Sequence, residues 1–517
     1  MEFKKALQYH QSGQLQKARE IYQKILEINP DHCDSLHLLG VIANQAGNND
    51  MAVKLIGRAI KINPKEPIYY NNIGNAFKAQ GNLKQAVFNY QKALELKPDF
   101  AEALVSMGSV YIELGRLKEA ISCFQKALQF KQNFPDAYYN MGIALKEQNR
   151  IAEAIICYKK SLELNPGFFD AYYNLGAIYK EQGRLDESGF CYRKVLELSP
   201  SNANAYYNLG VVHQKQDKLN EAITCYQKAV QLNPDYDKAY NNMGTSLKEQ
   251  GRHNEAISCY KKSLRIMPNA GIEVKMALMF PLIFESKELI KSEREKLSNR
   301  IELLMKKNIT LKDPAKEVGT TSFYLAYHGL KNKGLQEKLA DLFLHVCPDL
   351  AWESPNCNTQ QYTGGRINIG IISRFFHEHT IGLLNQGIIE NLSREKFHVK
   401  IFRFQGKEDA LTKSVDDAAD EAVILPNELA AARSIIAKHS LDILFYADIG
   451  MDSLTYFIAF SRLAPVQCTT WGHPVTTGIP NMDYYISSEN AEPPGANDHY
   501  SETLVLLKRY AMYCRRP

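Results

Sequence analysis

The chain has 517 residues, so it is too long for one core and should form two or more domains. Its 45% hydrophobic and 23% charged residues are typical of a globular protein. A net charge of +5 is weak, and no basic patch with interleaved aromatics occurs, so we expect no nucleic-acid partner. Neither a signal peptide nor a run near the ~20 apolar residues of a membrane helix is visible. The expected location is cytoplasmic, without membrane attachment.

A 34-residue register runs from the N-terminus to Pro268. Prolines keep this step at Pro30, Pro64, Pro98, Pro166, Pro200, Pro234 and Pro268. Glycines keep it at Gly40, Gly74, Gly108, Gly142, Gly176, Gly210 and Gly244. This period, in stretches such as AYYNLGAIYKEQGRLDESGFCYRKVLELSP, resembles the tetratricopeptide (TPR) helix–turn–helix repeat.

The spacing within one repeat predicts two helices. The first carries an apolar face at i, i+3, i+4 and i+7, made by Tyr172, Leu175, Gly176 and Tyr179. Gly183 marks the turn, and Asn149 and Asp217 replace it in two other repeats. The second helix faces the first with Ser188, Tyr192 and Val195. Since one pair cannot bury both its faces, seven full repeats over roughly 33–270, with a partial one before Pro30, should stack into a right-handed superhelix with a concave face.

Two further features belong to the register. Five of the 10 cysteines occupy one equivalent place in each second helix, namely Cys123, Cys157, Cys191, Cys225 and Cys259. Without any CxxC pair they indicate small packing residues, and we expect no metal site. A ladder of amides stands two residues before the register glycine, at Asn72, Asn140, Asn174, Asn208 and Asn242. These amides could bind the backbone of an extended peptide, or they could bridge neighbouring helices.

After the repeats the pattern changes twice. Residues 271–360 predict a helical linker region that ends in a polar, glycine-bearing connection. Short apolar strands then alternate with helices over 361–517, which predicts βαβ units and a parallel sheet in a Rossmann-like lobe. The strands are expected at 367–373, 398–404, 421–425, 442–448 and 466–471, and in YYISS and TLVLL.

Ligands of such a sheet bind at the carboxyl ends of the strands, so the loops SRFFHEHT (373–380), ADIGMDS and WGHPVTTGIP are candidate sites. The first loop opens a helix, where an anion can be bound, although on the residues alone its histidines are more simply surface residues of a loop. The third presents amides and hydroxyls, although its glycines and proline could simply shape the backbone. The acidic pair Asp416 and Asp417 is expected on a solvated helix face.

Five blocks occur in a specific order after the repeats: SFYLAYHG, GIISRFFHEHT, DILFYADIG, RLAPVQCTTWGHPVTTGIPNMDYYISSE and HYSETLVLL. In this order they resemble the O-linked N-acetylglucosamine transferase and SPINDLY family, and their sequences are similar to those of its bacterial members. The resemblance implies a TPR superhelix followed by the amino-terminal lobe of a GT-B-type glycosyltransferase. It also implies transfer of a sugar from UDP-GlcNAc or GDP-fucose to Ser or Thr of a protein or peptide acceptor in the TPR groove, without a metal or other cofactor.

The resemblance also assigns roles to residues. His379 stands where the family has its catalytic histidine, able to accept the hydroxyl proton or to orient a water relay. The donor and acceptor loops would include Ser373, Thr380, Gly472, His473, Pro474, Thr476, Thr477 and Gly478. Peptide binding becomes the favoured role of the Asn ladder, and Asp442 is expected to be structural.

Two departures from the family pattern qualify these expectations. Phe375 stands where the family usually has an aspartate. Relatives also continue into a second lobe that contacts the nucleotide, so this polypeptide alone is expected to bind nucleotide sugar weakly or not at all. The alternative function is a non-catalytic TPR scaffold for protein–protein interaction.

Overall fold

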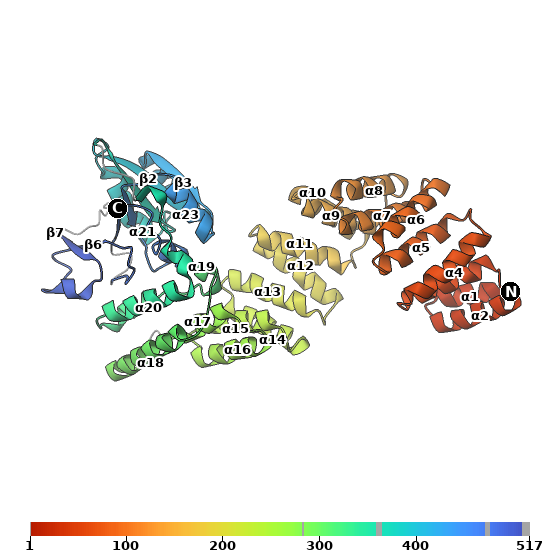
Figure 1. Cartoon of the computed structure of the whole chain (residues 1–517), viewed down its shortest axis with the longest axis horizontal. Helices are drawn as coiled ribbons and strands as arrows, with labels where there is room; N and C mark the ends of the chain where they lie inside the picture. The colour runs from red at the N-terminus through yellow and green to blue at the C-terminus, as the bar shows by residue number, and fades with distance from the viewer. Residues whose placement is uncertain (1, 282–283, 358–363, 471–475, 509–517) are drawn as a thin grey trace. The chain divides into compact units, whose positions relative to one another are not determined.

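The structure is a computed structural model that describes residues 2–281, 284–357, 364–470 and 476–508 (Figure 1). The chain divides into two compact units, Met1–Pro234 and Asp235–Pro517. The first unit contains only helices among its described residues, and the second combines helices with one sheet. No helix among the described residues has the length and apolar content needed to cross a membrane.

Seven helix pairs make up the first unit: α1 (Glu2–Gln11) with α2 (Leu15–Ile28), α3 (Cys33–Gln45) with α4 (Asn49–Ile62), α5 (Pro67–Ala79) with α6 (Leu83–Leu96), α7 (Ala101–Glu113) with α8 (Leu117–Phe130), α9 (Pro135–Glu147) with α10 (Ile151–Leu164), α11 (Phe169–Glu181) with α12 (Leu185–Leu198), and α13 (Ala203–Lys215) with α14 (Leu219–Leu232). An eighth pair, α15 (Asp237–Glu249) and α16 (His253–Ile266), belongs to the second unit. The stretch before Pro30, predicted as a partial repeat, therefore forms a helix pair of its own.

The turn inside each pair needs a left-handed residue, as the register predicts. Gly183 has φ 73°, and its replacements Asn149 and Asp217 have φ 61° and 59°. Asn and Asp are the side chains that tolerate this region best after glycine, because their short polar groups can bond locally. The prediction that these two residues replace the turn glycine is confirmed.

The register glycines let the two helices of a pair come close together. A Cβ on Gly74 would lie 2.6 Å from Cε1 of Tyr90, and one on Gly210 would lie 2.6 Å from Cε1 of Tyr226. These tyrosines are fully buried, so each ring fills the space that a side chain on the glycine would need. The predicted inner stripe of the second helix is confirmed as well, because Ser188, Tyr192 and Val195 are all fully buried.

The register cysteines pack as small apolar residues. Every cysteine in the described part of the chain is unpaired, and Cys123, Cys157, Cys191 and Cys259 are buried. Burial raises the pKa of the Cys123 thiol to about 11, so it stays neutral. A neutral, buried thiol behaves as a small hydrophobic group, as the spacing predicts.

The second unit continues with helices that lead into the sheet. They are α17 (Ala270–Ala277), α18 (Lys287–Met305), α19 (Pro314–Glu317), the 3-10 helix η1 (Phe323–His328), α20 (Lys333–Val346), and the 3-10 helices η2 (Pro348–Ala351) and η3 (Pro355–Cys357). Val274, Leu297 and Phe343 from these helices share one hydrophobic core with Leu444 and Phe457 of the α/β part. The helical region is therefore packed into the sheet domain, while the boundaries at 270 and 360 stay predictions.

The sheet has seven parallel strands in the order β3-β2-β1-β4-β5-β6-β7. The strands are β1 (Ile367–Ser373), β2 (Phe397–Phe404), β3 (Glu421–Leu425), β4 (Ile443–Tyr446), β5 (Val466–Thr469), β6 (Tyr484–Ser488) and β7 (Thr503–Leu507). The connections hold α21 (Thr380–Asn391), α22 (Ala410–Ala418), α23 (Leu429–Ala437), α24 (Ser453–Ile458) and the 3-10 helix η4 (Ala496–His499). The predicted parallel sheet and its strands are confirmed.

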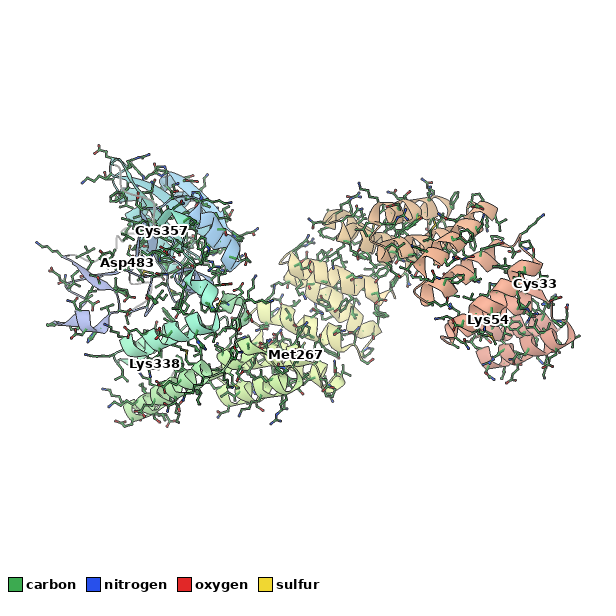
Figure 2. The ribbon with its side chains drawn as sticks, viewed as in Figure 1. Cys33, Lys54, Met267, Lys338, Cys357 and Asp483 are labelled. Carbon is green, nitrogen blue, oxygen red and sulfur yellow. The ribbon has the colours of Figure 1, made fainter. Side chains whose placement is uncertain are left out.

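Aspartates that precede three of the strands brace the amino edge of the sheet. Asp442 Oδ2 accepts the N–H of Asn368 on β1 at 2.7 Å. Asp483, labelled in Figure 2, accepts the N–H of Gln467 on β5 at 2.8 Å. Asp420 accepts the N–H of Val399 on β2 at 2.8 Å. Asp442 therefore holds neighbouring strands together, in agreement with its predicted structural role.

Candidate active site at the carboxyl edge of the sheet

The strand order reverses between β1 and β4. The chain runs from β1 outward through β2 to β3, and then returns to place β4 on the other side of β1. Ligands of open α/β sheets bind in the crevice outside the carboxyl ends of the strands at such a reversal. The loops after β1 (373–380) and β4 (447–452) leave the sheet there, and β5 lies beside β4.

Arg374 ties the first two loops together. Its backbone N–H donates to Asp448 Oδ2 at 3.0 Å. Its guanidinium donates to Asn427 Oδ1 at 3.1 Å and lies 3.6 Å from Asp452 Oδ2. Sequence reasoning missed Arg374, although its place directly after a strand that ends at the reversal was a usable signal. A half-exposed cation is thereby held at the carboxyl edge of the sheet, where the strand order reverses.

Asp448 is the second residue that sequence reasoning missed, although its loop was singled out. Its side chain is fully buried, and Oδ1 has no hydrogen-bond partner among the described residues. Burial raises the pKa of this carboxyl to about 7, against the opposing effect of the Arg374 N–H. A carboxyl group that gains or loses its proton near neutral pH therefore lies directly beneath the reversal of strand order.

His379 caps α21 at this edge. Its Nδ1 accepts the N–H of Ile381 at 3.2 Å, and its ring stacks on Phe375 with centroids 4.4 Å apart. Burial, and next the nearby His377, lower the pKa of His379, so the ring is neutral at pH 7. In a neutral ring whose Nδ1 accepts, the proton sits on Nε2. The outward nitrogen is thus a donor, and a role as proton acceptor requires the capping bond to be released.

The remaining residues of this loop have different environments. Ser373 is fully buried, and its Oγ accepts the N–H of Phe375 at 2.9 Å. Thr380 is exposed as the first residue of α21. The backbone N–H of Glu378 donates to Asp409 Oδ2 at 2.8 Å, which links this loop to the start of α22. Only His379 and Thr380 of the predicted residues in this loop are therefore accessible to a ligand.

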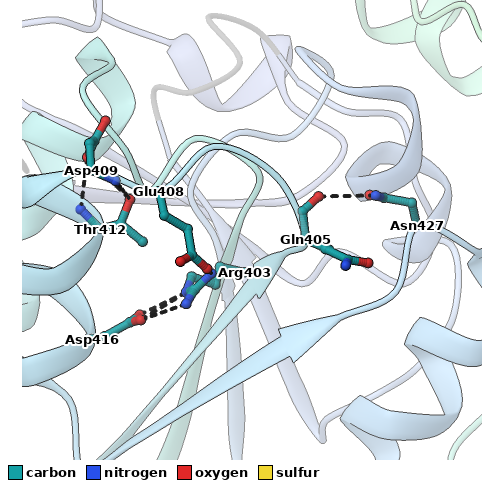
Figure 3. Close-up of polar contacts among 7 residues, drawn as sticks. All are labelled: Arg403, Gln405, Glu408, Asp409, Thr412, Asp416 and Asn427. Carbon is teal, nitrogen blue, oxygen red and sulfur yellow. Dashed lines mark hydrogen bonds and ion pairs between the residues drawn. The ribbon is translucent and has the colours of Figure 1, made fainter. Parts of the chain in front are cut away.

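Asp409 belongs to a polar cluster beyond β2 (Figure 3). It forms a capping box with Thr412 at the start of α22. In the same cluster Arg403, which is buried, donates to both carboxylate oxygens of Asp416 at 3.1 and 3.0 Å and to Glu408 at 2.9 Å. The prediction that Asp416 lies on a solvated face is wrong, because this ion pair orients it toward the end of β2.

The loop after β5 is organised by Glu502, which sequence reasoning missed. This buried carboxylate accepts from Thr476 Oγ1 at 2.6 Å, from the Thr477 N–H at 2.8 Å and from Thr477 Oγ1. Gly478 has φ 71°, and a Cβ on it would lie 2.4 Å from the backbone of Gln336. These three loop residues therefore shape and anchor the backbone. The other predicted residues, Gly472, His473 and Pro474, lie outside the described part of the chain.

The Asn ladder in the first unit bridges neighbouring repeats. Three of its amides bond to the residue 35 places earlier: Asn72 to His37 Nε2 at 2.7 Å, Asn174 to Tyr139 OH at 3.1 Å and Asn208 to Tyr173 OH at 2.9 Å. Asn208 also accepts from Lys180 Nζ at 2.6 Å and is buried. These bonds satisfy amides that peptide binding would also use, and peptide binding stays a prediction.

Asn140 differs from these three. The residue 35 places before it is Val105, which offers no polar atom, so its Nδ2 donates to Asp136 O in its own helix at 2.8 Å. Asn242 belongs to the second unit, where it is half-buried. Among the described residues, the Asn140 amide has no bond to a neighbouring repeat.

Comparison with known families agrees with this architecture. Residues 321–513 match the model of glycosyl transferase family 41. Tetratricopeptide repeat models match residues 9–73, 74–217 in four overlapping segments, and 201–269. The chain carries TPR repeats followed by a family 41 glycosyltransferase domain.

Curated relatives of this TPR and family 41 chain include two kinds of transferase. It is 33% identical over 88 residues to a UDP-glucose:protein N-beta-glucosyltransferase of Actinobacillus pleuropneumoniae, covering 17% of the chain and 14% of that protein. It is 27% identical over 191 residues to a probable UDP-N-acetylglucosamine–peptide N-acetylglucosaminyltransferase SPINDLY of Arabidopsis thaliana. That match covers 34% of this chain and 20% of the Arabidopsis protein. The chain thus spans a fifth or less of the length of these relatives.

Among solved structures, an O-GlcNAc transferase mutant of Thermobaculum terrenum aligns with 68% of the chain and 59% of its own, at 21% identity and a TM-score of 0.43. The TPR protein YrrB aligns with 36% of the chain and 95% of its own, at 30% identity and a TM-score of 0.31.

Proposed function

We propose that this chain takes part in transferring a sugar from a nucleotide donor to a protein, with the acceptor held by the TPR repeats. The observation that carries the proposal is the match to family 41 over 321–513, which contains the reversal of strand order. His379 lies at that reversal with an accessible imidazole, and Arg374 at the same edge of the sheet carries a cation that bonds to Asn427. A protein acceptor and a nucleotide sugar are the expected partners.

The geometry suggests what His379 does in such a transfer. An acceptor hydroxyl must lose a proton as its oxygen attacks the sugar, while the diphosphate leaves with negative charge. In the tautomer that the Ile381 bond requires, His379 can donate a hydrogen bond from Nε2 to an oxygen of donor or acceptor. It can serve as the proton acceptor only after the other tautomer forms, so we propose orientation of the acceptor oxygen as its primary role.

The linkage and the donor are open between two chemistries. Transfer to Ser or Thr from UDP-GlcNAc or GDP-fucose follows from the O-GlcNAc transferase and SPINDLY resemblance. Transfer of glucose from UDP-glucose to a protein nitrogen is the second candidate, because the Actinobacillus relative named for it shows 33% identity. A metal or other cofactor is not part of either proposal.

The test is a transfer assay on the full-length gene product with radiolabelled UDP-GlcNAc, UDP-glucose and GDP-fucose, each offered with acceptor peptides that carry Ser, Thr or Asn. Calorimetric titration of UDP and GDP measures donor binding separately. We expect His379→Ala to reduce labelling by about 10²–10⁴-fold, and the neighbouring His377→Ala to leave it within about 3-fold. Equal activity of the two variants would remove His379 from the site.

The alternative is a non-catalytic scaffold, in which the TPR repeats bind proteins and the family 41 domain only packs against the last repeat. This function predicts no labelling with any donor and no calorimetric signal with UDP or GDP, while peptide binding persists. The cytoplasmic location expected from the sequence remains part of our proposal and can be tested by fractionating cells that express the native gene.

A further inference from the structure

Residues 320–322, with the sequence Thr-Thr-Ser, lie between α19 and the 3-10 helix η1, outside both elements. Each of the three carries a side-chain hydroxyl, and each hydroxyl bonds to a different part of the second unit. The partners are the last helix pair, the loop after β4, and α20, on which the loop after β5 rests. We call 320–322 the hydroxyl bridge, and none of the roles assigned above uses it.

The first residue of the hydroxyl bridge is bonded to the last helix pair. Thr320 Oγ1 accepts from Lys248 Nζ on α15 at 2.9 Å. In an earlier repeat Lys180 stands in the same register place, and it donates to Asn208 of the following repeat at 2.6 Å. Thr320 therefore takes the place of a side chain in a following repeat, so α15 holds the hydroxyl bridge as one repeat holds its neighbour.

The second residue reaches the loop after β4. Thr321 Oγ1 donates to the carbonyl oxygen of Gly450. Gly450 lies midway in the chain between Asp448 and Asp452. Asp448 accepts the backbone N–H of Arg374 at 3.0 Å, and Asp452 lies 3.6 Å from its guanidinium. Thr321 is therefore bonded to the middle of the stretch that holds the cation at the carboxyl edge.

The third residue supports the loop after β5 through α20. Ser322 Oγ donates to Gln336 Oε1 at 2.6 Å, and both side chains are buried. The backbone of Gln336 contacts Gly478 so closely that a Cβ on Gly478 would lie 2.4 Å from the Gln336 carbonyl carbon. A shift of the first turn of α20 would therefore displace the loop that Glu502 anchors.

A cavity in the second unit reaches the first two of these residues. It has a volume of about 300 Å³, and its lining includes Lys248, Thr320 and Thr321. Tyr324, whose side chain is exposed, also lines it. A group that enters this cavity therefore meets the bond between the last helix pair and the hydroxyl bridge.

We propose that the hydroxyl bridge positions the two loops at the carboxyl edge, and that the bond from Lys248 to Thr320 makes their position depend on the last helix pair. Consecutive Cα atoms lie about 3.8 Å apart, so a displacement of one hydroxyl is passed to its neighbours. A contiguous chain of bonds can carry energetic coupling between distant sites in this way. The consequence for sugar transfer, that an acceptor on the last repeats adjusts the loops, rests on the function proposed above.

Amide hydrogen exchange, measured on this chain without any substrate, tests the coupling. Lys248→Met and Thr320→Val each remove the bond between α15 and the hydroxyl bridge. Both should speed exchange in the loops 447–452 and 476–482 by about 2- to 10-fold, the range expected for the loss of one hydrogen bond. Thr320→Ser keeps the hydroxyl and should leave exchange in both loops unchanged.

Two further variants separate the two branches of the hydroxyl bridge. Thr321→Val should speed exchange in 447–452 only, and Ser322→Ala should speed it in 476–482 only. In the Thr321→Val background, Lys248→Met should add nothing in 447–452 but should still speed exchange in 476–482. Such non-additivity would show that the effect passes through the hydroxyl bridge.

The matched control is Lys180→Met, because it removes the equivalent bond in the first unit and should leave both loops unchanged. Exchange in β2 and β3 reports general loosening of the second unit, and we expect it to stay the same in every variant. Unchanged exchange in both loops of Lys248→Met would overturn the proposal. An equal increase in β2 and β3 would also overturn it, because the effect would then be a general loss of stability.

Transfer by the full-length gene product gives a second readout. Lys248→Met should lower kcat for a protein acceptor by about 2- to 10-fold and leave KM for the donor within about 2-fold, because it disturbs the position of the loops and leaves the donor contacts in place. Thr320→Ser should keep the original kcat. An unchanged kcat in Lys248→Met would overturn the positioning role. The expected exchange pattern without transfer from any donor would refute only the proposed function.

Discussion

Replacing the buried Asp448 with asparagine should change how the stability of the second unit depends on pH. Its carboxyl pKa of about 7 lies above the ordinary aspartate value of 3.8 because the side chain is fully buried. Between these two values the unfolded chain releases the proton that the folded protein keeps. Stability is therefore lost as pH rises from about 4 to about 7.

The size of this loss follows from the shift. One pKa unit corresponds to about 1.4 kcal/mol, so the rise of this pKa from 3.8 to about 7 corresponds to roughly 4 kcal/mol. Asparagine is uncharged at every pH and can still accept the Arg374 N–H through its amide oxygen. Asp448→Asn should therefore be more stable than the unchanged protein at pH 8, and the advantage should shrink to near zero at pH 4.

Tryptophan fluorescence suits this measurement, because both tryptophans, Trp352 and Trp471, belong to the second unit. Urea unfolding followed at pH 4.5, 6, 7 and 8 gives the free energy of unfolding of that unit. Asp498→Asn, which changes an exposed aspartate, is the control and should follow the unchanged protein. A difference between Asp448→Asn and the unchanged protein that stays constant over this pH range would refute the reasoning.

Three further predictions concern packing and hydrogen bonds, each measured by thermal or urea unfolding. Gly74→Ala should destabilise its repeat by about 1–3 kcal/mol, because the new Cβ would lie 2.6 Å from the buried ring of Tyr90. The control Gly57→Ala should instead stabilise its helix by up to about 1 kcal/mol, because the nearest neighbour of its Cβ would lie 3.9 Å away. Glu502→Ala should destabilise the second unit by about 3–5 kcal/mol, because it leaves two buried threonines without their acceptor, and a loss below about 1 kcal/mol would contradict the central role of Glu502 in this loop. Asn208→Ala should lower the free energy of unfolding by about 1–3 kcal/mol, because its amide bridges two repeats. Asn140→Ala should change that free energy by no more than about 0.5 kcal/mol but should weaken peptide binding. Unchanged peptide affinity in Asn140→Ala would leave the ladder with a structural role.

The position of the ladder amides could be predicted from the sequence, but their partners could not. A spacing of 34 residues places Asn174 and Asn208 at one equivalent site on successive first helices. Whether each amide contacts a peptide or its neighbour depends on the side chain 35 residues earlier, and therefore on how closely two repeats stack. The hydroxyl of Tyr139 lies within reach of Asn174, whereas Val105 offers no polar atom to Asn140.

The candidate site shows a similar division. Strand spacing and the HEH sequence identified the loop of His379, but the direction of its hydrogen bond, and hence its tautomer, depends on the backbone of α21. The threonines after β5 were predicted to face a ligand. They bond instead to Glu502, 25 or 26 residues later, which no local pattern could indicate.

The elements could be predicted from residue order alone: the 34-residue helix pairs with their turn residues and close glycine contacts, and the seven strands with the loops that follow them. These features depend on local periodicity, which every short stretch carries within itself. The tertiary contacts, in contrast, are what bury Asp448 beside Arg374 and make Glu502 the anchor of the loop after β5. Burial and charge pairing arise where segments distant in sequence meet, and a side chain's protonation and partners are set by those neighbours.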